Sequence, residues 1–166
     1  MPASQIVVDV LIDHHLDSPL NSHEIGEIVK AAASDQGFYH GQIGVRITTD
    51  SEIHQINRQH LQHDYPTDVI SFDYRSEDYQ TENQSEKRIE GELVVSVETA
   101  DQQASELGWS CKNELALYLV HGTLHVCGMD DQEPEARLEM RRAEQRVLKR
   151  VGIHLPENVS PDGGFR

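Results

Sequence analysis

The stretches that favour strands and those that favour helices are separated along this chain of 166 residues. Four stretches are β-branched runs or alternate between apolar and polar residues, and all lie in the first 97 residues: 6–12, 42–49, 68–74 and 89–97. Three helical stretches then follow with no further strand: 98–107, 111–127 and 134–150. This order predicts an α+β fold with a small mixed sheet of about four strands and about five helices.

The other two predicted helices lie between the strands. Residues 22–35 repeat apolar side chains on one helical face, and Asn21 and Glu24 have the spacing of a capping box. Asp50 is predicted to cap a second, short helix directly after the strand at 42–49. Both helices are therefore expected to begin at residues that satisfy the free N–H groups of a first turn.

Two polar segments lack any periodic pattern. Residues 75–88, RSEDYQTENQSEKR, are acidic and almost free of aliphatic side chains, which predicts a mobile hairpin loop. The segment lies between two strands and does not divide the chain, so residues 1–166 are predicted to form one domain. Residues 155–166 are predicted to be a flexible tail.

Charge and cysteine content limit the possible functions. Acidic residues outnumber basic ones by 29 to 14, and the net charge of −15 disfavours non-specific attraction to nucleic acids. No apolar run approaches the roughly 20 residues of a membrane span, and residues 1–13 lack a secretory signal pattern. Cys111 and Cys127 fall on one predicted helix, too far apart to bridge, which favours a reducing, cytoplasmic location.

The segment His121–Asp131, HGTLHVCGMDD, has the pattern of a metal site. His121 and His125 are four residues apart, so their imidazoles lie on one helix face. Gly128 lets the chain end the helix and fold back, which brings Asp131 to the same ion. Three such ligands leave a fourth tetrahedral position for a water molecule, which is typical of a catalytic zinc site. The histidine pair alone would equally fit two partly buried helix residues, but the whole string predicts metal binding.

Two neighbouring residues limit the chemistry of this site. Zinc proteases of the H-E-x-x-H type place a glutamate beside the first histidine as general base, and Gly122 occupies that position here. A metallopeptidase is therefore disfavoured. Cys127 lies two residues beyond His125 and faces the opposite side of the helix, so we interpret it as a small buried residue rather than a ligand.

The motif resembles that of the YbeY family of bacterial endoribonucleases, which reads H-G-x-L-H-L-x-G-Y-D-H. The matching positions are His121, Gly122, Leu124, His125, Gly128 and Asp130. The family's asparagine and its P-T-D-V-L-S-F segment are similar to Asn57 followed by Pro66, Thr67, Asp68, Val69, Ile70, Ser71 and Phe72. Its G-D/E-I-V-I strand is similar to Gly91, Glu92, Leu93, Val94 and Val95.

The resemblance implies a zinc-dependent endoribonuclease with a metal helix like that of zinc metalloproteases. Such an enzyme would cleave single-stranded RNA, process the 3′ end of 16S ribosomal RNA and act in ribosome quality control. Its expected partners are RNA and the ribosome or its assembly factors, with neither a membrane nor DNA involved. Either water or the RNA 2′-OH would be the nucleophile. The alternative is a ribosome-assembly or RNA-binding factor whose metal is only structural.

The chain departs from the family motif at three positions. Asp131 replaces the third histidine ligand, and carboxylate is an acceptable zinc ligand. Met129 replaces the motif tyrosine. Leu61 occupies the position where the family has an arginine suited to phosphate, and Arg58 or Arg46 is a candidate substitute.

Other side chains are candidates to support the site. The resemblance implies that the loop carrying His63 and Asp64 faces the metal, where either would orient water or RNA, and His63 is the fallback third ligand should Asp131 point away. The alternative is that both are ordinary polar surface residues. Ser71 and Asp68 are interpreted as structural supports of the site wall. The last helix is basic and would contact phosphates or form a solvated face with internal ion pairs. Its basic residues are Arg137, Arg141, Arg142, Arg146, Lys149 and Arg150.

Overall fold

The structure, a computed structural model, describes residues 3–60, 69–75 and 87–155. Within these ranges the chain forms four strands and five helices, which confirms the predicted α+β fold. Their order is β1 (Gln5–Ile12), α1 (Ser22–Asp35), β2 (His40–Thr48), α2 (Asp50–His60), β3 (Val69–Asp73), β4 (Arg88–Ser96), α4 (Val97–Leu107), α5 (Cys111–Val126) and α6 (Pro134–Arg150). Residues 76–86 of the predicted loop and 156–166 of the predicted tail lie outside the described residues.

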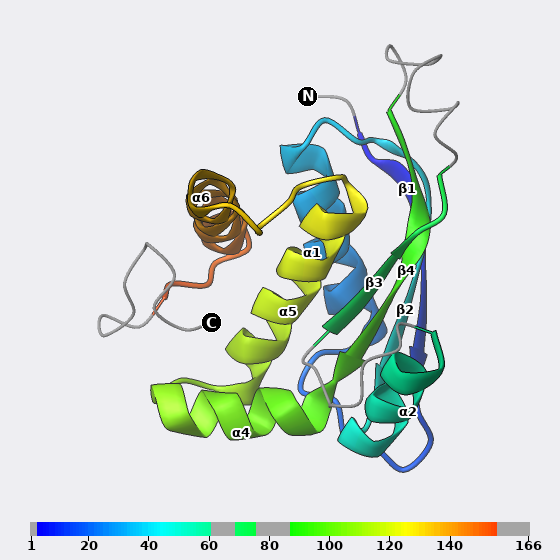
Figure 1. The fold of residues 1–166 in the computed structure, drawn as a ribbon, viewed down its shortest axis with the longest axis vertical. Coiled ribbons are helices and arrows are strands. Elements are labelled where there is room, and N and C mark those ends of the chain that lie inside the picture. The colour runs from blue at the N-terminus through cyan, green and yellow to red at the C-terminus, as the bar shows by residue number, and fades with distance from the viewer. Residues whose placement is uncertain (1–2, 61–68, 76–86, 156–166) are drawn as a thin grey trace.

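The four strands form one mixed sheet in the order β1-β2-β4-β3 (Figure 1). Strands β1, β2 and β4 are parallel, with Val10 opposite Val45 and Val45 opposite Leu93. Strand β3 pairs with β4 in the antiparallel direction and lies at the edge of the sheet. Parallel neighbours need a crossover, and α1 supplies it between β1 and β2.

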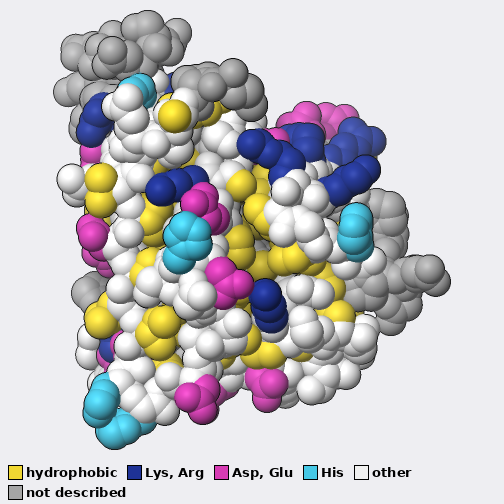
Figure 2. Space-filling model, turned by 180° about the vertical axis from the view of Figure 1, so that it is seen from behind, with side chains coloured by type: hydrophobic (Ala, Val, Ile, Leu, Met, Phe, Trp, Pro, Cys, Tyr) yellow, Lys and Arg dark blue, Asp and Glu magenta, His cyan; other side chains and the backbone are white. Residues whose placement is uncertain are grey.

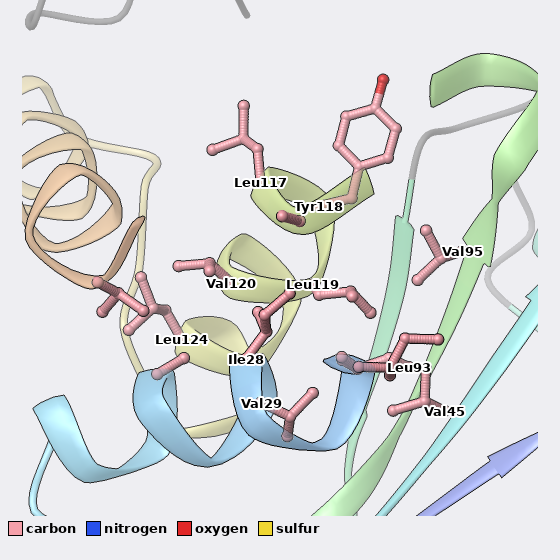
Figure 3. Close-up of a cluster of buried hydrophobic side chains, with 14 of the residues drawn as sticks. Ile28, Val29, Val45, Leu93, Val95, Leu117, Tyr118, Leu119, Val120 and Leu124 are labelled. Atoms are coloured by element: carbon pink, nitrogen blue, oxygen red, sulfur yellow. The ribbon is translucent and has the colours of Figure 1, made fainter. Parts of the chain in front are cut away.

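Helix α5 is buried on almost every side. It contacts β3 and β4 of the sheet and also α1, α4 and α6 (Figure 1). Its residues 115–120 are all buried, as expected for a helix whose apolar side chains surround its axis. Figure 3 shows side chains of α5 meeting those of α1 and of the strands in one core cluster. A helix held in this way is a rigid support for the side chains at its end.

The helix starts follow the sequence signals with one correction. Asn21 and Glu24 form the predicted capping box, with each side chain accepting from the backbone N–H of the other residue. Asp50 is not the cap of α2 but its first residue, and the Thr49 hydroxyl accepts from the Glu52 N–H instead. The Asp50 carboxylate is turned away because it accepts from the hydroxyl of Thr99, on α4.

Helix α2 packs on the face of the sheet opposite α5. Ile53 of α2 packs there against Ile70 of β3 and Val94 of β4. Val94 alternates with Leu93 and Val95, which both belong to the main core, so the two clusters lie on opposite faces. None of the helices within the described ranges combines the length and the apolar character that a bilayer span requires.

Candidate metal centre

The chain reverses direction directly after the C-terminal end of α5. Gly128 has a φ of 104°, in the left-handed region that favours glycine. Its N–H donates to the carbonyl of His125 (2.9 Å), and the N–H of Met129 donates to the carbonyl of Leu124 (3.0 Å). These two bonds form a Schellman motif, which satisfies carbonyl groups at the helix end. The reversal brings Asp131 back beside the histidines, as the spacing predicts.

Three side chains converge at this end of α5. The Nε2 atoms of His121 and His125 are 3.0 Å apart, and an oxygen of Asp131 lies 3.7 Å from the first and 3.4 Å from the second. Ligands of a tetrahedral zinc ion, at bond lengths of about 2.0–2.1 Å, lie about 3.3 Å from one another. Among the described residues this group has the geometry to hold a metal ion. The predicted trio is therefore brought together.

The second nitrogen of each ring fixes which nitrogen faces the centre. Nδ1 of His125 lies 3.0 Å from the carbonyl oxygen of Met129, and Nδ1 of His121 lies 2.5 Å from a carboxylate oxygen of Glu144. A carbonyl and a carboxylate only accept, so each Nδ1 is the donor. In the neutral rings the two Nε2 lone pairs therefore face each other. The two lone pairs repel each other, and a cation placed between them would attract both.

The local environment favours the neutral ring that a metal requires. Burial lowers the pKa of His125 below its usual value, and the neighbouring His121 lowers it further, while Asp131 opposes both effects. A ligand histidine must be unprotonated, so a lowered pKa extends metal binding to more acidic solutions. The side chains of His121, His125 and Asp131 remain 18%, 29% and 33% exposed. The centre is therefore open to small molecules.

Glu144 is the residue of this centre that the sequence interpretation missed. It lies on α6, is 1% exposed, and accepts from the guanidinium of Arg141, which is itself 5% exposed. The sequence position of Glu144 indicates burial, because it follows Met140 by four residues and precedes Val147 by three. Both of those apolar residues are buried, so Glu144 falls within the apolar stripe of α6. A carboxylate there requires a buried partner, which is His121.

Gly122 lies against the sheet, with no room for a side chain. A Cβ atom at this position would lie 2.9 Å from side-chain carbons of both Leu93 and Val69. The Ser71 hydroxyl donates to the Gly122 carbonyl at 3.1 Å, which ties β3 to α5 beside the histidines. Ser71 thus has a structural contact of the kind predicted for it. A glutamate base at position 122 is excluded by this packing as well as by the sequence.

Comparison with protein families identifies the group to which the chain belongs. A model described as Endoribonuclease YbeY matches residues 12–152, a range that contains the whole candidate metal centre. This chain is a member of the YbeY family. The family consists of endoribonucleases, which are hydrolases of phosphodiester bonds, so the prediction of a nuclease is confirmed.

Individual YbeY relatives cover most of the chain. Endoribonuclease YbeY of Rhodopirellula baltica is 46% identical over 172 aligned positions, covering 97% of this chain and 84% of the relative. The enzyme of that name from Bacteroides thetaiotaomicron is 36% identical, covering 78% and 88%. The solution structure of TM1509 from Thermotoga maritima matches with a TM-score of 0.57 and 20% identity, over 87% of this chain and 91% of that one. This last likeness supports the fold.

Of the three positions that depart from the YbeY motif, the structure describes residues 129 and 131 but not residue 61. Met129 contributes its backbone carbonyl to His125, so this contact does not depend on the side chain at that position. Asp131 takes the place expected of the third ligand. Leu61, His63 and Asp64 lie outside the described residues, together with Asp68.

The two arginines considered as substitutes at the YbeY phosphate position lie apart from α5. Arg46 alternates along β2 with the core residues Val45 and Ile47, so it projects from the sheet face opposite α5. Its guanidinium binds both carboxylate oxygens of Asp13, each at 2.9 Å. Arg46 is therefore not free to clamp a phosphate. Arg58 lies exposed on α2.

The basic residues of α6 are largely engaged within the protein. Figure 2 shows Lys and Arg side chains gathered on the side of the molecule where α6 lies. Arg146 forms two bonds of 2.7 Å with Asp35 of α1, and Arg137 donates to the Gln132 carbonyl. Arg141 is buried against Glu144 rather than facing solvent. These contacts weigh against a phosphate-binding helix. They are also not the expected ion pairs between residues four apart on a solvated face, since Arg146 pairs with α1 and Arg141 with a buried carboxylate three residues on.

Cys127 is the capping residue at the end of α5 and is not part of the metal group. Burial raises the pKa of its thiol to about 12, which keeps it protonated at neutral pH. Zinc binds the thiolate form. The sequence predicts a small buried residue at Cys127, and it does pack against the core, although it is only partly buried.

Proposed function

We propose that this chain is a zinc-dependent endoribonuclease that cleaves single-stranded RNA, with one zinc ion held by His121, His125 and Asp131. Family membership supports the reaction class. The observation that carries the choice of a metal is the convergence of two Nε2 lone pairs and a carboxylate oxygen at the edge lengths of a tetrahedron. The partial exposure of all three side chains supports a catalytic rather than a closed structural site.

Zinc suits the cleavage of a phosphodiester. When bound, it lowers the pKa of a coordinated water to about 7 and polarises a phosphoryl oxygen. The protein then needs no glutamate base at position 122, and it supplies charge neutralisation and positioning instead. His121 and His125 are held by the rigid helix α5, and Asp131 by the Schellman turn that follows.

The finer assignments rest on the family resemblance. We propose that Arg58, His63 and Asp64 position the RNA, and that Ser71 supports the wall of the site. The proposed cellular role is processing of the 16S ribosomal RNA 3′ end and ribosome quality control, with the ribosome or its assembly factors as partners. Two free cysteines support a reducing, cytoplasmic setting.

The test compares two double histidine variants. The protein is stripped with a chelator, reloaded with zinc, and incubated with labelled single-stranded RNA and with the same sequence as a duplex. We expect His121→Ala with His125→Ala to slow cleavage of the single strand at least about 100-fold, because several kcal/mol of charge stabilisation is lost. The control is His14→Ala with His15→Ala, which removes two exposed histidines at the end of β1.

The control variant should cleave at the wild-type rate and leave the duplex largely intact. Equal cleavage by both double variants would mean that the activity is a contaminant, and the proposal would be wrong. A wild-type protein that takes up zinc and binds RNA without cleaving it would favour the alternative, an assembly factor with a structural metal.

A further inference from the structure

We infer that Glu144 is a positioning residue of the metal centre, and that the buried Arg141 holds it in place. This inference rests on the proposed function. Glu144 is not one of the three residues that converge on the metal position. It acts on His121 from the side of the ring that faces away from the centre.

The contact is specific in its atoms. A carboxylate oxygen of Glu144 lies 2.5 Å from Nδ1 of His121, while Nε2 of the same ring points to His125 and Asp131. Because Glu144 accepts a hydrogen bond from the Nδ1–H group, Nε2 is left as the free ligand atom, and the carboxylate partner raises the electron density of the ring. The corresponding partner of His125 is an uncharged carbonyl. His121 is therefore the more strongly supported of the two ligands.

The surroundings of Glu144 fix its position. Its side chain is 1% exposed, and Nη1 of Arg141 lies 2.8 Å and 3.0 Å from its two oxygens. A buried carboxylate held from both sides has little freedom to rotate, so it sets the plane of the His121 ring. Positioning of this kind is typical of histidine ligands, whose outer nitrogen almost always donates to a fixed acceptor.

The pairing also sets the charge behind the centre. Asp131 already places one carboxylate among the ligands, at the position where the YbeY motif has a neutral histidine. A second unpaired carboxylate behind His121 would reduce the positive charge of the loaded centre further. The guanidinium of Arg141 offsets the charge of Glu144, so the ring gains an acceptor at little cost in net charge.

The test measures zinc affinity rather than cleavage. Wild type, Glu144→Gln and Glu144→Ala are titrated with zinc in competition with a chromophoric chelator, and thermal unfolding of the metal-free proteins is followed in parallel. We expect Glu144→Ala to weaken zinc binding by about 10- to 100-fold. The zinc affinity of Glu144→Gln should fall between those of wild type and Glu144→Ala. Its amide oxygen still accepts a hydrogen bond from Nδ1–H but carries no charge.

Leu148→Ala is the matched control, since Leu148 is also fully buried on α6 and lies one turn beyond Glu144. It should lower the unfolding temperature and leave zinc affinity within about twofold. If Glu144→Ala does not fold, Glu144→Gln decides the question. Unchanged zinc affinity in a folded Glu144 variant would overturn the inference and leave the proposed function intact. A wild-type protein that takes up no zinc would overturn both.

The visible spectrum of the cobalt-loaded protein provides an independent readout. Cobalt takes the place of zinc in the same ligand set, and its absorption bands depend on the arrangement of the ligands. We expect the bands to shift or broaden in Glu144→Gln, because the His121 ring is no longer held by a charged acceptor. Identical spectra for Glu144→Gln and wild type would contradict a positioning role.

Discussion

Two arginine–carboxylate pairs in this protein have similar contact distances and very different surroundings. Arg141 and Glu144 meet on α6, against α5, at 2.8 Å and 3.0 Å, with side chains 6% and 1% exposed. Arg46 and Asp13 meet at the end of the first two strands, at 2.9 Å, with side chains 34% and 23% exposed. The two pairs differ most in burial. They also differ in geometry, because Arg46 donates from two nitrogens and Arg141 from Nη1 alone.

Burial changes what such a pair contributes. Two charges removed from water lose hydration that their attraction often fails to restore, so a buried pair is weak evidence of stabilisation. A partly exposed pair loses less and also gains less. The second partner of each carboxylate, besides the arginine, is the more informative contact. It is the ring of His121 for Glu144 and the hydroxyl of Thr48 for Asp13.

The largest expected effect follows from removing one arginine from each pair. Arg141→Met leaves the buried Glu144 without its cation, and we expect the free energy of unfolding to fall by about 3–5 kcal/mol. Arg46→Met removes a pair of which both members reach solvent, and the expected loss is below about 1 kcal/mol. Urea denaturation of the metal-free proteins at pH 7 measures both. Equal losses of unfolding free energy for the two variants would mean that burial does not distinguish the two pairs.

The exposed fraction of a carboxylate does not alone decide how much it contributes to zinc binding, and Asp131 provides the test. Its side chain is 33% exposed, close to that of Asp13, yet it lies with two histidines rather than with an arginine. We expect Asp131→Ala to weaken zinc binding by more than the roughly 100-fold that outer partners of a ligand account for. Asp13→Ala should leave zinc affinity unchanged. Unchanged metal content of dialysed Asp131→Ala would remove Asp131 from the site.

The site ligands were predictable because they belong to one local segment. The spacing of His121 and His125, the glycine at 128 and the return to Asp131 all follow from helix geometry and the conformational freedom of glycine. The strands and helices were predictable for the same reason, since their periodicity lies within each segment. The order β1-β2-β4-β3 was not predicted, because strand pairing depends on contacts between distant segments.

The role of Glu144 could not be read from sequence in the same way. It comes from α6, 23 residues beyond His121, and the contact exists only once α6 packs on α5. The sequence interpretation treated α6 as a basic helix and did not consider the acidic residue in its apolar stripe. Most of the basic side chains face solvent or pair within the protein. The assignment of Asp50 as a helix cap failed for a related reason. Its carboxylate finds a partner in Thr99, far along the chain.

A smaller effect tests how tightly the region around the metal centre is packed. In Gly122→Ala the new methyl group would meet Leu93 and Val69 at 2.9 Å, closer than side-chain carbons normally approach. We expect a loss of about 1–3 kcal/mol in the free energy of unfolding, as for other overpacked sites. The control is Gly108→Ala, where nothing lies within 4 Å but φ is 80°, so it reports backbone strain without crowding.

Denaturation of both glycine variants with and without zinc separates the two contributions. Gly122→Ala should also weaken zinc binding, because it pushes α5 away from β3 beside His121. Gly108→Ala should not, since it lies at the opposite end of α5 from the histidines. If Gly122→Ala is as stable as wild type, the contact between α5 and β3 is looser than the distances indicate.

The smallest expected effect concerns the exposed pair and its dependence on pH. The hydrogen bonds from Arg46 hold the pKa of Asp13 below its usual value, burial opposes this, and the Thr48 hydroxyl lowers the pKa further. The unfolded chain therefore takes up this proton first as the solution is acidified.

The contribution of Asp13 is fully present above its ordinary pKa of about 3.9 and is lost as the pH falls below that value. We expect Asp13→Asn to cost less than about 1 kcal/mol at pH 7, and the difference from wild type to stay constant down to about pH 4 and to shrink below it. A difference that stays constant well below about pH 4 would mean that Asp13 contributes through packing rather than through its charge, and the contrast with the buried Glu144 would then rest on shape alone.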